Sequence, residues 1–243
     1  MKVAAIIQAR MSSTRLPGKV LIDLGGETVL ARVVRRLQRA DLIDEIVVAT
    51  TTSATDNAIV AECERLSVRA FRGEENDVLD RYYHAAKWVG ADTIVRITSD
   101  CPLIDAEVTG HTIRAFHSCK PDYASNALHR TYPRGLDTEV MTGDALTHVW
   151  EEARFSYQRA HVTPYIYENP DRFEILAVRG KADHSDYRWT LDTPEDLTFI
   201  RAIYERMDND DSFSWRDVLA LLEREPELIE LNRDVRQKAL QEG

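Results

Sequence analysis

Short apolar runs alternate along the chain with segments whose apolar residues recur every three or four positions. The run Val3 to Ile7 is of the first kind and indicates a buried strand. The segment 28–40 is of the second kind, since Val29, Val33 and Leu37 recur at helical spacing. We expect the four arginines of this helix to lie on its solvated face.

The same reading along the whole chain gives an alternation of strands and helices. Strands are predicted at 3–7, 45–50, 68–71, 93–98, 137–141, 173–178 and 187–191. Helices are predicted at 28–40, 56–66, 76–89, 105–118, 143–153, 156–168, 193–207, 214–223 and 227–241. The alternation predicts an α/β three-layer sandwich, in which helices cover both faces of a mostly parallel sheet.

The length of the chain and the lack of a linker-like segment indicate its domain organisation. A chain of 243 residues, 44% hydrophobic and 30% charged, suits one larger domain with a sizeable core. No Gly/Ser-rich linker precedes the last helices. We therefore expect residues 208–243 to form a helical extension packed on a catalytic domain of residues 1–207.

Cysteine content and charge indicate which cellular compartment and which classes of partner to expect. Cys63, Cys101 and Cys119 are too few and too scattered for a disulfide framework or a zinc site. No apolar run is long enough for a signal peptide or a membrane span, so a reducing cytoplasm is expected. The net charge of −10 argues against a nucleic-acid partner.

Positive charge is concentrated near the N-terminus, where residues 1–40 hold eight cations and two acids. Three of the cations, Arg10, Arg15 and Lys19, lie in the loop after the first strand and follow no helical period. Open α/β sheets bind ligands at the carboxyl ends of their strands. Two guanidiniums and an ammonium at such an edge are suited to a triphosphate.

Two aspartates are candidates for the Mg²⁺ that phosphoryl chemistry usually requires. Asp100 follows the predicted strand at 93–98, and Asp192 follows the one at 187–191. Each has an alternative interpretation. Asp100 precedes Pro102 and could simply form a turn, whereas Asp192 begins a string in which Thr193 would cap a helix.

Six ordered segments carry a resemblance to a known family. The segment QARMSSTRLPGKVL (8–21) is followed by FRGEENDVLDRYYHAA, TSDCPLID, RGLDTEV, HVTPYIYENP and RWTLDTPEDL. Together they resemble the cytidylyltransferases that make CMP-activated acidic sugars, among them CMP-Kdo synthetase and acylneuraminate cytidylyltransferase, and they are most similar to the spore-coat polysaccharide F subgroup. The resemblance covers about residues 1–205. Nucleotide fingerprints of other classes are absent, since neither G-x-G-x-x-G nor a P-loop occurs.

The resemblance implies a Rossmann-like nucleotidyltransferase fold of the GT-A-like kind. It also implies transfer of CMP from CTP to an acidic or phosphorylated acceptor, with release of pyrophosphate. It assigns the triphosphate to Arg10, Arg15 and Lys19, with Arg10 and Lys19 as the catalytic cations, and assigns Mg²⁺ to Asp100 and Asp192. Ser12 and Asp100 are also expected to contact nucleotide. Ser12, Ser99 and Cys101 depart from the family pattern.

Weaker candidates have ordinary structural alternatives. Arg72, predicted just beyond a strand, could bind nucleotide or be a plain loop arginine. Asp137 and Glu139, two apart on a predicted strand, would share one face and could contact the acceptor, although a solvent-facing edge explains them nearly as well. His161 is a candidate for the acceptor too, or a packed residue.

Two rival functions remain open at this stage. One is a glycosyltransferase that uses a preformed nucleotide sugar, although the acidic pair 208 and 210 stands in a poor context for its metal motif. The other is a nucleotide-binding protein without turnover. The expected partners are CTP, a small acceptor and a second copy of the chain in a homodimer, without membrane or nucleic acid.

Overall fold

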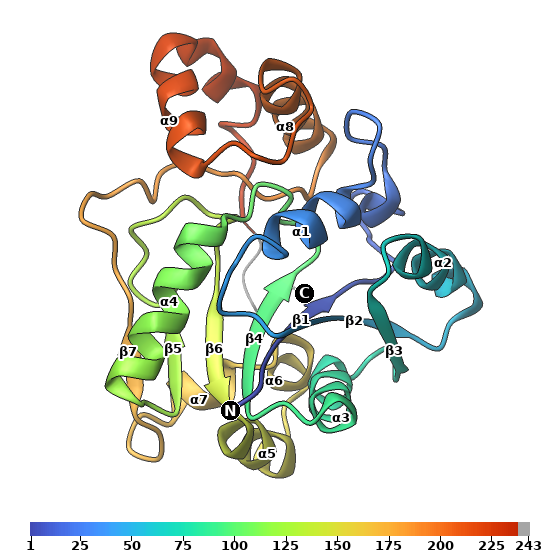
Figure 1. Cartoon of the computed structure of the whole chain (residues 1–243), viewed down its shortest axis with the longest axis vertical. Helices are drawn as coiled ribbons and strands as arrows, with labels where there is room; N and C mark the ends of the chain where they lie inside the picture. Colours follow the sequence, from blue (N-terminus) through green and yellow to red (C-terminus); the bar gives the residue numbers. More distant parts are fainter. Residues whose placement is uncertain (238–243) are drawn as a thin grey trace.

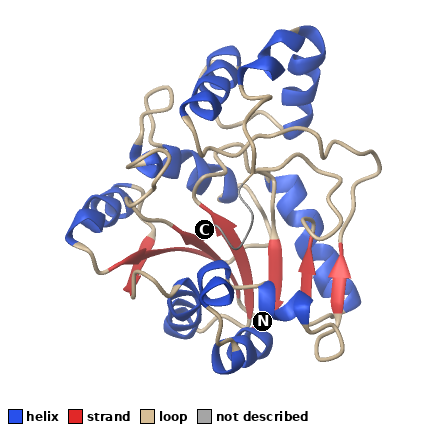
Figure 2. Cartoon of the chain, turned by 180° about the vertical axis from the view of Figure 1, so that it is seen from behind, coloured by secondary structure: helices blue, strands red, loops and turns tan. Residues whose placement is uncertain are grey.

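The structure, a computed structural model, describes residues 1–237 and is built around one seven-stranded sheet (Figure 2). The strand order is β3-β2-β1-β4-β6-β5-β7. Only β6 runs antiparallel to its neighbours within these residues, so the predicted mostly parallel sheet is confirmed. The strands are β1 (Val3–Gln8), β2 (Glu45–Thr51), β3 (Arg69–Gly73), β4 (Thr93–Thr98), β5 (Tyr123–Ser125), β6 (Glu139–Thr142) and β7 (Ile175–Ala177).

Helices cover both faces of the sheet. Successive residues of a buried strand point to opposite sides, so β1 contributes apolar side chains to the core on each face. Ala5 and Ile7 of β1 join the apolar cluster under α1, α2 and α4, whereas Ala4 and Ile6 join the cluster under α3, α5 and α7. The helices of these two layers are α1 (Val29–Leu37), α2 (Asn57–Arg65), α3 (Val78–Val89), α4 (Ala106–Cys119), α5 (Gly143–Glu152), α6 (Ser156–His161) and α7 (Pro164–Glu168). No helix within residues 1–237 is long and apolar enough to cross a membrane.

The C-terminal helices stand beyond the carboxyl ends of the parallel strands, at the top of Figure 1. They are α8 (Pro194–Arg206), α9 (Trp215–Arg224) and the 3-10 helix η3 (Pro226–Leu231). Their apolar side chains share a third cluster with Leu24, from the region after β1, and Leu103, from the loop after β4. Residues 213–231 therefore pack directly on the rest of the described chain.

Two arginines of α1 are buried, which makes the prediction of a solvated arginine face wrong for them. Arg32 and Arg36 are each only 2% exposed. Arg32 donates to the carbonyls of Leu24 and Asn209 and to the carboxylate of Asp211. Arg36 donates to the carbonyl of Asp211 as well and to the carbonyls of two further loop residues, Ile104 and Phe213. These contacts attach the segment after α8 to α1. The helical pattern of α1 could not reveal partners about 175 residues away.

Three predicted elements differ from the structure, and one strand was not predicted. The stretch 187–191 forms no strand; it is extended and joined to Arg134 by one isolated bridge. The short β5 was missed. The predicted helix at 156–168 is two helices, because Pro164 begins α7 and cannot continue α6. Of the predicted helix at 227–241, only η3 forms, residues 232–237 are not helical, and residues 238–243 lie outside the described residues.

Candidate functional site

Lys19 stands at the centre of the predicted site, in the loop after β1. Gly18 (φ 69°) is in the left-handed conformation that glycine adopts at no steric cost, and the short 3-10 helix η1 (Lys19–Leu21) begins directly after it. The ammonium nitrogen of Lys19 lies 2.8 Å from Oδ2 of Asp100, 2.8 Å from Oδ1 of Asp192 and 2.8 Å from the carbonyl oxygen of Leu191. All three ammonium protons therefore have an acceptor.

Asp100 and Asp192, 92 positions apart in the sequence, meet at this one nitrogen. Because both contacting oxygens lie 2.8 Å from the same atom, they cannot be further apart than twice that distance, about 5.6 Å. Asp100 follows β4, and the amide of Leu191 bonds to the Asp100 carbonyl at 2.8 Å. The extended stretch before Asp192 thus lies against the loop after β4.

Further cations surround Asp192. Its second oxygen lies 3.0 Å from Arg15 and 2.9 Å from Arg188, and Arg188 also binds Asp196. The helix start next to it is capped by another residue, because Thr193 accepts from the amide of Asp196 and Pro194 is the first helical residue. Capping therefore explains Thr193 and Asp196 but not the side chain of Asp192.

The charges at this junction support one another. Burial by itself would raise the pKa of Asp100, but the adjacent Lys19 charge and the hydrogen bonds from Lys19 and Thr98 lower it to about 2. Burial would likewise lower the pKa of Lys19, and the two aspartates raise it instead. Both aspartate and lysine are therefore charged at neutral pH.

The donor set suits a hard divalent cation of the magnesium kind. Mg²⁺ commonly takes one or two carboxylates and completes its octahedron with water and phosphate oxygens. No group of three or more His, Cys, Asp or Glu side chains suited to a metal occurs among residues 1–237. Asp100 and Asp192 are the carboxylates of this junction that could hold such an ion, with the remaining positions left to phosphate and water.

Arg10 and Ser12 lie in the first half of the basic loop, the segment after β1 that carries Arg10, Arg15 and Lys19. Arg10 is exposed and makes no hydrogen bond or ion pair within the described part of the chain. The Ser12 hydroxyl lies 3.1 Å from Oε1 of Glu75. The structure therefore joins Arg15 and Lys19 to the two aspartates but leaves Arg10 outside that cluster.

Arg81 is a cation of this region that the sequence analysis missed. It is 1% exposed, donates to the carbonyls of Glu74 and Glu75 at 2.6 and 2.9 Å, and has no partner for Nε in the described structure. Burial, together with the nearby charge of Arg10, lowers its pKa. The helical pattern could have indicated that Arg81 is buried, because the apolar residues Val78 and Ala85 lie on the same face of α3.

Asp56 fixes the start of the basic loop. One carboxylate oxygen accepts from the amide of Met11 at 2.8 Å, and the other accepts from the hydroxyls of Thr50 and Thr51 and the amide of Thr51. Asp56 is 1% exposed. Although burial favours the neutral form, these hydrogen bonds lower its pKa.

Arg72 lies within β3, not beyond it as predicted, and holds the loop after β2. Its Nε donates to the carbonyl of Thr51, and its two terminal nitrogens donate to Asn57 and to the carbonyl of Ser53, at 2.7–2.9 Å. All three nitrogens have protein partners. This arrangement favours the structural alternative for Arg72.

Asp137 and Glu139 contact different partners. Asp137 precedes β6 and forms a two-pronged ion pair with Arg130. Glu139 is buried and accepts from Arg96, from the Tyr123 hydroxyl and, at 2.7 Å, from the Thr163 hydroxyl. A solvent-facing strand edge therefore does not describe Glu139.

His161 ends α6, next to a strained turn at Val162. The amide of Thr163 bonds to the His161 carbonyl at 2.9 Å, and Val162 between them has φ 73° and ψ −53°. This is the rare γ-turn with a positive φ, which is costly for a β-branched residue. Such strain persists only where the surroundings enforce it, and it clusters at functional sites.

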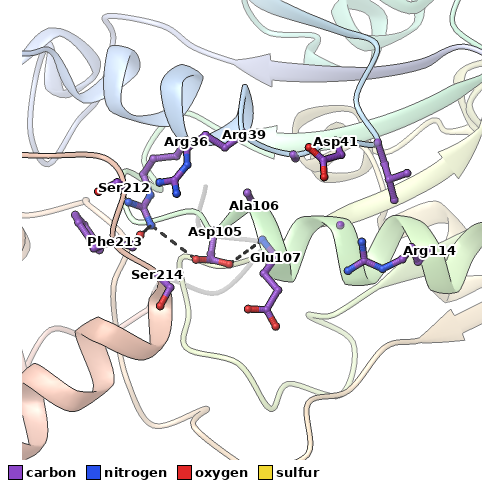
Figure 3. Close-up of a pocket in the computed structure, with 13 residues that line it drawn as sticks. Arg36, Arg39, Asp41, Asp105, Ala106, Glu107, Arg114, Ser212, Phe213 and Ser214 are labelled. Atoms are coloured by element: carbon purple, nitrogen blue, oxygen red, sulfur yellow. Dashed lines mark hydrogen bonds and ion pairs between the residues drawn. The ribbon is translucent and has the colours of Figure 1, made fainter.

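One hollow of the surface lies away from this junction. A cavity of about 340 Å³ opens between α1, the first half of α4 and residues 212–214 (Figure 3). In it Asp105 caps α4 and faces Arg36, while Glu107 pairs with Arg216. The adjoining acidic turn 208–212 is likewise engaged, since Asp211 pairs with Arg32. None of the predicted site residues lines this cavity.

Comparison with known proteins shows which family this chain resembles. A family described as "Cytidylyltransferase" matches residues 4–223. An uncharacterized protein of Methanocaldococcus jannaschii is 40% identical over 246 residues, which cover 100% of this chain and 99% of that protein. The spore coat polysaccharide biosynthesis protein SpsF of Bacillus subtilis is 35% identical over 231 residues, 91% of this chain and 94% of that protein.

The similarity extends to a solved structure. A cytidylyltransferase from Leptospira borgpetersenii serovar Hardjo-bovis superposes with a TM-score of 0.91 and 33% identity, covering 98% of this chain and 100% of that one. The α/β nucleotidyltransferase-like fold is therefore shared over nearly the whole length. The predicted resemblance is confirmed at the level of the family.

Proposed function

The chain belongs to the cytidylyltransferase family, and on that premise we propose that it transfers CMP from CTP to an acidic sugar or a related acceptor, with release of pyrophosphate. The observation that carries the proposal is the junction of Lys19 with Asp100 and Asp192 at the carboxyl edge of the sheet. Cations for a triphosphate and carboxylates for a divalent metal are both present there.

In this proposal the cations bind and orient the triphosphate. Lys19 and Arg15 belong to the junction itself, and exposed Arg10, with buried Arg81 close to it, extends the positive charge along the loop. Positive charge that is already in position before the reaction stabilises the pentavalent phosphorus of the transition state and the departing pyrophosphate. Mg²⁺ held by Asp100 and Asp192 would supply further charge neutralisation when bound.

The acceptor would lie toward β6 and the α6–α7 link. Glu139 joins β4, β5 and β6 to Thr163, and the strained turn beside Thr163 fixes the backbone of His161. We assign His161 to acceptor binding and Glu139 to holding this wall in place. The preference for an acidic acceptor rests on the resemblance to enzymes that activate acidic sugars.

A pyrophosphate-release screen tests the proposal. Four nucleoside triphosphates are each combined with Mg²⁺ and a panel of acidic sugars and phosphorylated polyols. We expect release with CTP and at least one acidic acceptor. Release only with another nucleotide would overturn the base assignment. CTP binding without release of pyrophosphate in the presence of any acceptor would favour a binding protein. Sugar transfer in a separate assay with a preformed nucleotide sugar would favour a glycosyltransferase.

A further inference from the structure

The ammonium of Lys19 is fully occupied by protein acceptors in the arrangement seen here. It has three protons, and each faces an acceptor at 2.8 Å: Asp100, Asp192 and the carbonyl of Leu191. The side chain is only 12% exposed. No ammonium proton is left for a phosphate oxygen while these contacts last.

The oxygens of both carboxylates are occupied as well. Oδ1 of Asp100 accepts from the Thr98 hydroxyl at 2.6 Å, and its Oδ2 accepts from Lys19. Oδ1 of Asp192 accepts from Lys19, and its Oδ2 faces Arg15 and Arg188. A divalent cation bridging the two aspartates would have to sit where the ammonium is, and two cations cannot share that position.

We propose that Lys19 acts as a resident counter-ion that keeps the metal position between Asp100 and Asp192 closed until a triphosphate draws the ammonium away. The identity of the triphosphate and of the metal rests on the proposed function. Lys19 then exchanges carboxylate oxygens for phosphate oxygens, and the divalent cation takes the carboxylates. Lysine suits this exchange because its charge sits on a flexible stem.

The consequence is a coupling between metal and nucleotide. A triphosphate that draws the Lys19 ammonium away from Asp100 and Asp192 raises the affinity of the two aspartates for the metal. By linkage, the bound metal raises the affinity of the protein for the triphosphate. Without nucleotide, the intact chain should bind a divalent cation weakly at this position. Removing the ammonium while keeping a stem of similar length should open it.

Mn²⁺ binding in the absence of nucleotide tests the exchange, read from the loss of the free-ion signal in electron paramagnetic resonance. We expect Lys19→Met to bind Mn²⁺ about tenfold tighter than the unsubstituted chain or more, within the usual range of coupling between sites. The double variant Lys19→Met, Asp192→Asn should lose this gain. Lys2→Met is the matched control, because Lys2 pairs with a single carboxylate, Glu45, at 2.7 Å.

A second variant and a second readout guard against a folding defect. Lys19→Gln removes the charge but keeps a polar donor, and Mn²⁺ should raise the Tm of either variant more than that of the unsubstituted chain. Equal Mn²⁺ affinity in the folded variants and the unsubstituted chain would overturn the exchange. If the unsubstituted chain releases pyrophosphate from CTP in that case, the proposed function stands. A gain in Mn²⁺ affinity in the variants, together with no CTP turnover by the unsubstituted chain, would support the exchange and refute the function.

Discussion

The hydroxyl of Thr163 lies 2.7 Å from Oε1 of Glu139, and this contact ties the α6–α7 link to the first residue of β6. Both residues are buried, and Glu139 also receives the Tyr123 hydroxyl and the Arg96 guanidinium. A buried carboxylate is tolerated only when its oxygens are satisfied in this way. The link therefore depends on a charged hydrogen bond rather than on apolar packing alone.

Thr163→Val should destabilise the protein by about 2 kcal/mol, because a hydrogen bond to a buried carboxylate is lost while the side-chain shape is kept. Urea unfolding followed by circular dichroism measures the change. Thr163→Ser keeps the hydroxyl and is the matched control, with a smaller expected loss. Equal losses in the Val and Ser variants would show that the hydroxyl contributes nothing.

The turn at Val162 predicts an inverted order of two substitutions. Alanine is normally better tolerated than glycine inside a fold, but at φ 73° a Cβ is strained and glycine is not. Both variants lose the same buried packing of Val162 apart from one methyl group. We expect Val162→Gly to be more stable than Val162→Ala by about 1 kcal/mol in urea unfolding. The usual order, with alanine ahead, would argue against strain.

The sequence predicted the sheet and the place of Asp100, because local patterns identify strand ends and β4 ends where expected. It named Asp192 as well, but after a strand at 187–191 that does not form. It did not predict what Asp192 touches, since the string around it also satisfies a helix start. The structure separates the two roles: Thr193 caps α8, and Asp192 faces Lys19. Only the distance between segments far apart in the sequence could make that distinction.

Contacts at long range explain the other differences. The apolar pattern of α1 is correct, yet Arg32 is buried because loop carbonyls from the C-terminal region surround it. The stretch 187–191 has the composition of a strand, but its partners are the loop residues Arg134 and Asp100 and no continuous ladder forms. The composition of a segment indicates which secondary structure it favours, but it does not show which other segments it will contact.

Asp56→Asn should loosen the basic loop and destabilise the protein by about 2 kcal/mol at pH 7, because an amide cannot accept from both Met11 and Thr51. The pKa of Asp56 is lower in the folded protein than in the unfolded chain. Its contribution is therefore complete above the unfolded value, about 3.9, and is lost as the pH falls below it.

Unfolding free energies of the two proteins at several pH values measure this contribution. The difference between the unsubstituted chain and Asp56→Asn should be constant from pH 6 to 8 and should shrink below about pH 4. A difference that does not change down to pH 3 would mean that the charge of Asp56 is not involved.

Arg81→Gln should weaken CTP binding about tenfold, because a buried guanidinium near Arg10 adds positive charge under the basic loop. Isothermal titration calorimetry measures the affinity. Arg65→Gln is the control, since Arg65 is largely exposed on α2 and pairs with Glu27 and Glu62. Unchanged affinity in a folded Arg81→Gln variant would place Arg81 in the fold alone.

Asp192 and its neighbour Thr193 allow chemistry and helix capping to be separated. Asp192→Asn removes a charged oxygen from the junction with Lys19, so Mg²⁺-dependent pyrophosphate release should fall about tenfold to 100-fold. The Tm should change little, because the α8 cap is Thr193. Thr193→Ala should do the reverse: a loss of about 1 kcal/mol in stability, with turnover largely kept. Pyrophosphate release and thermal melting on both variants decide the matter. If Asp192→Asn retains full turnover, the carboxylate serves only to pair with Lys19 and the two arginines, and a metal role for it is excluded.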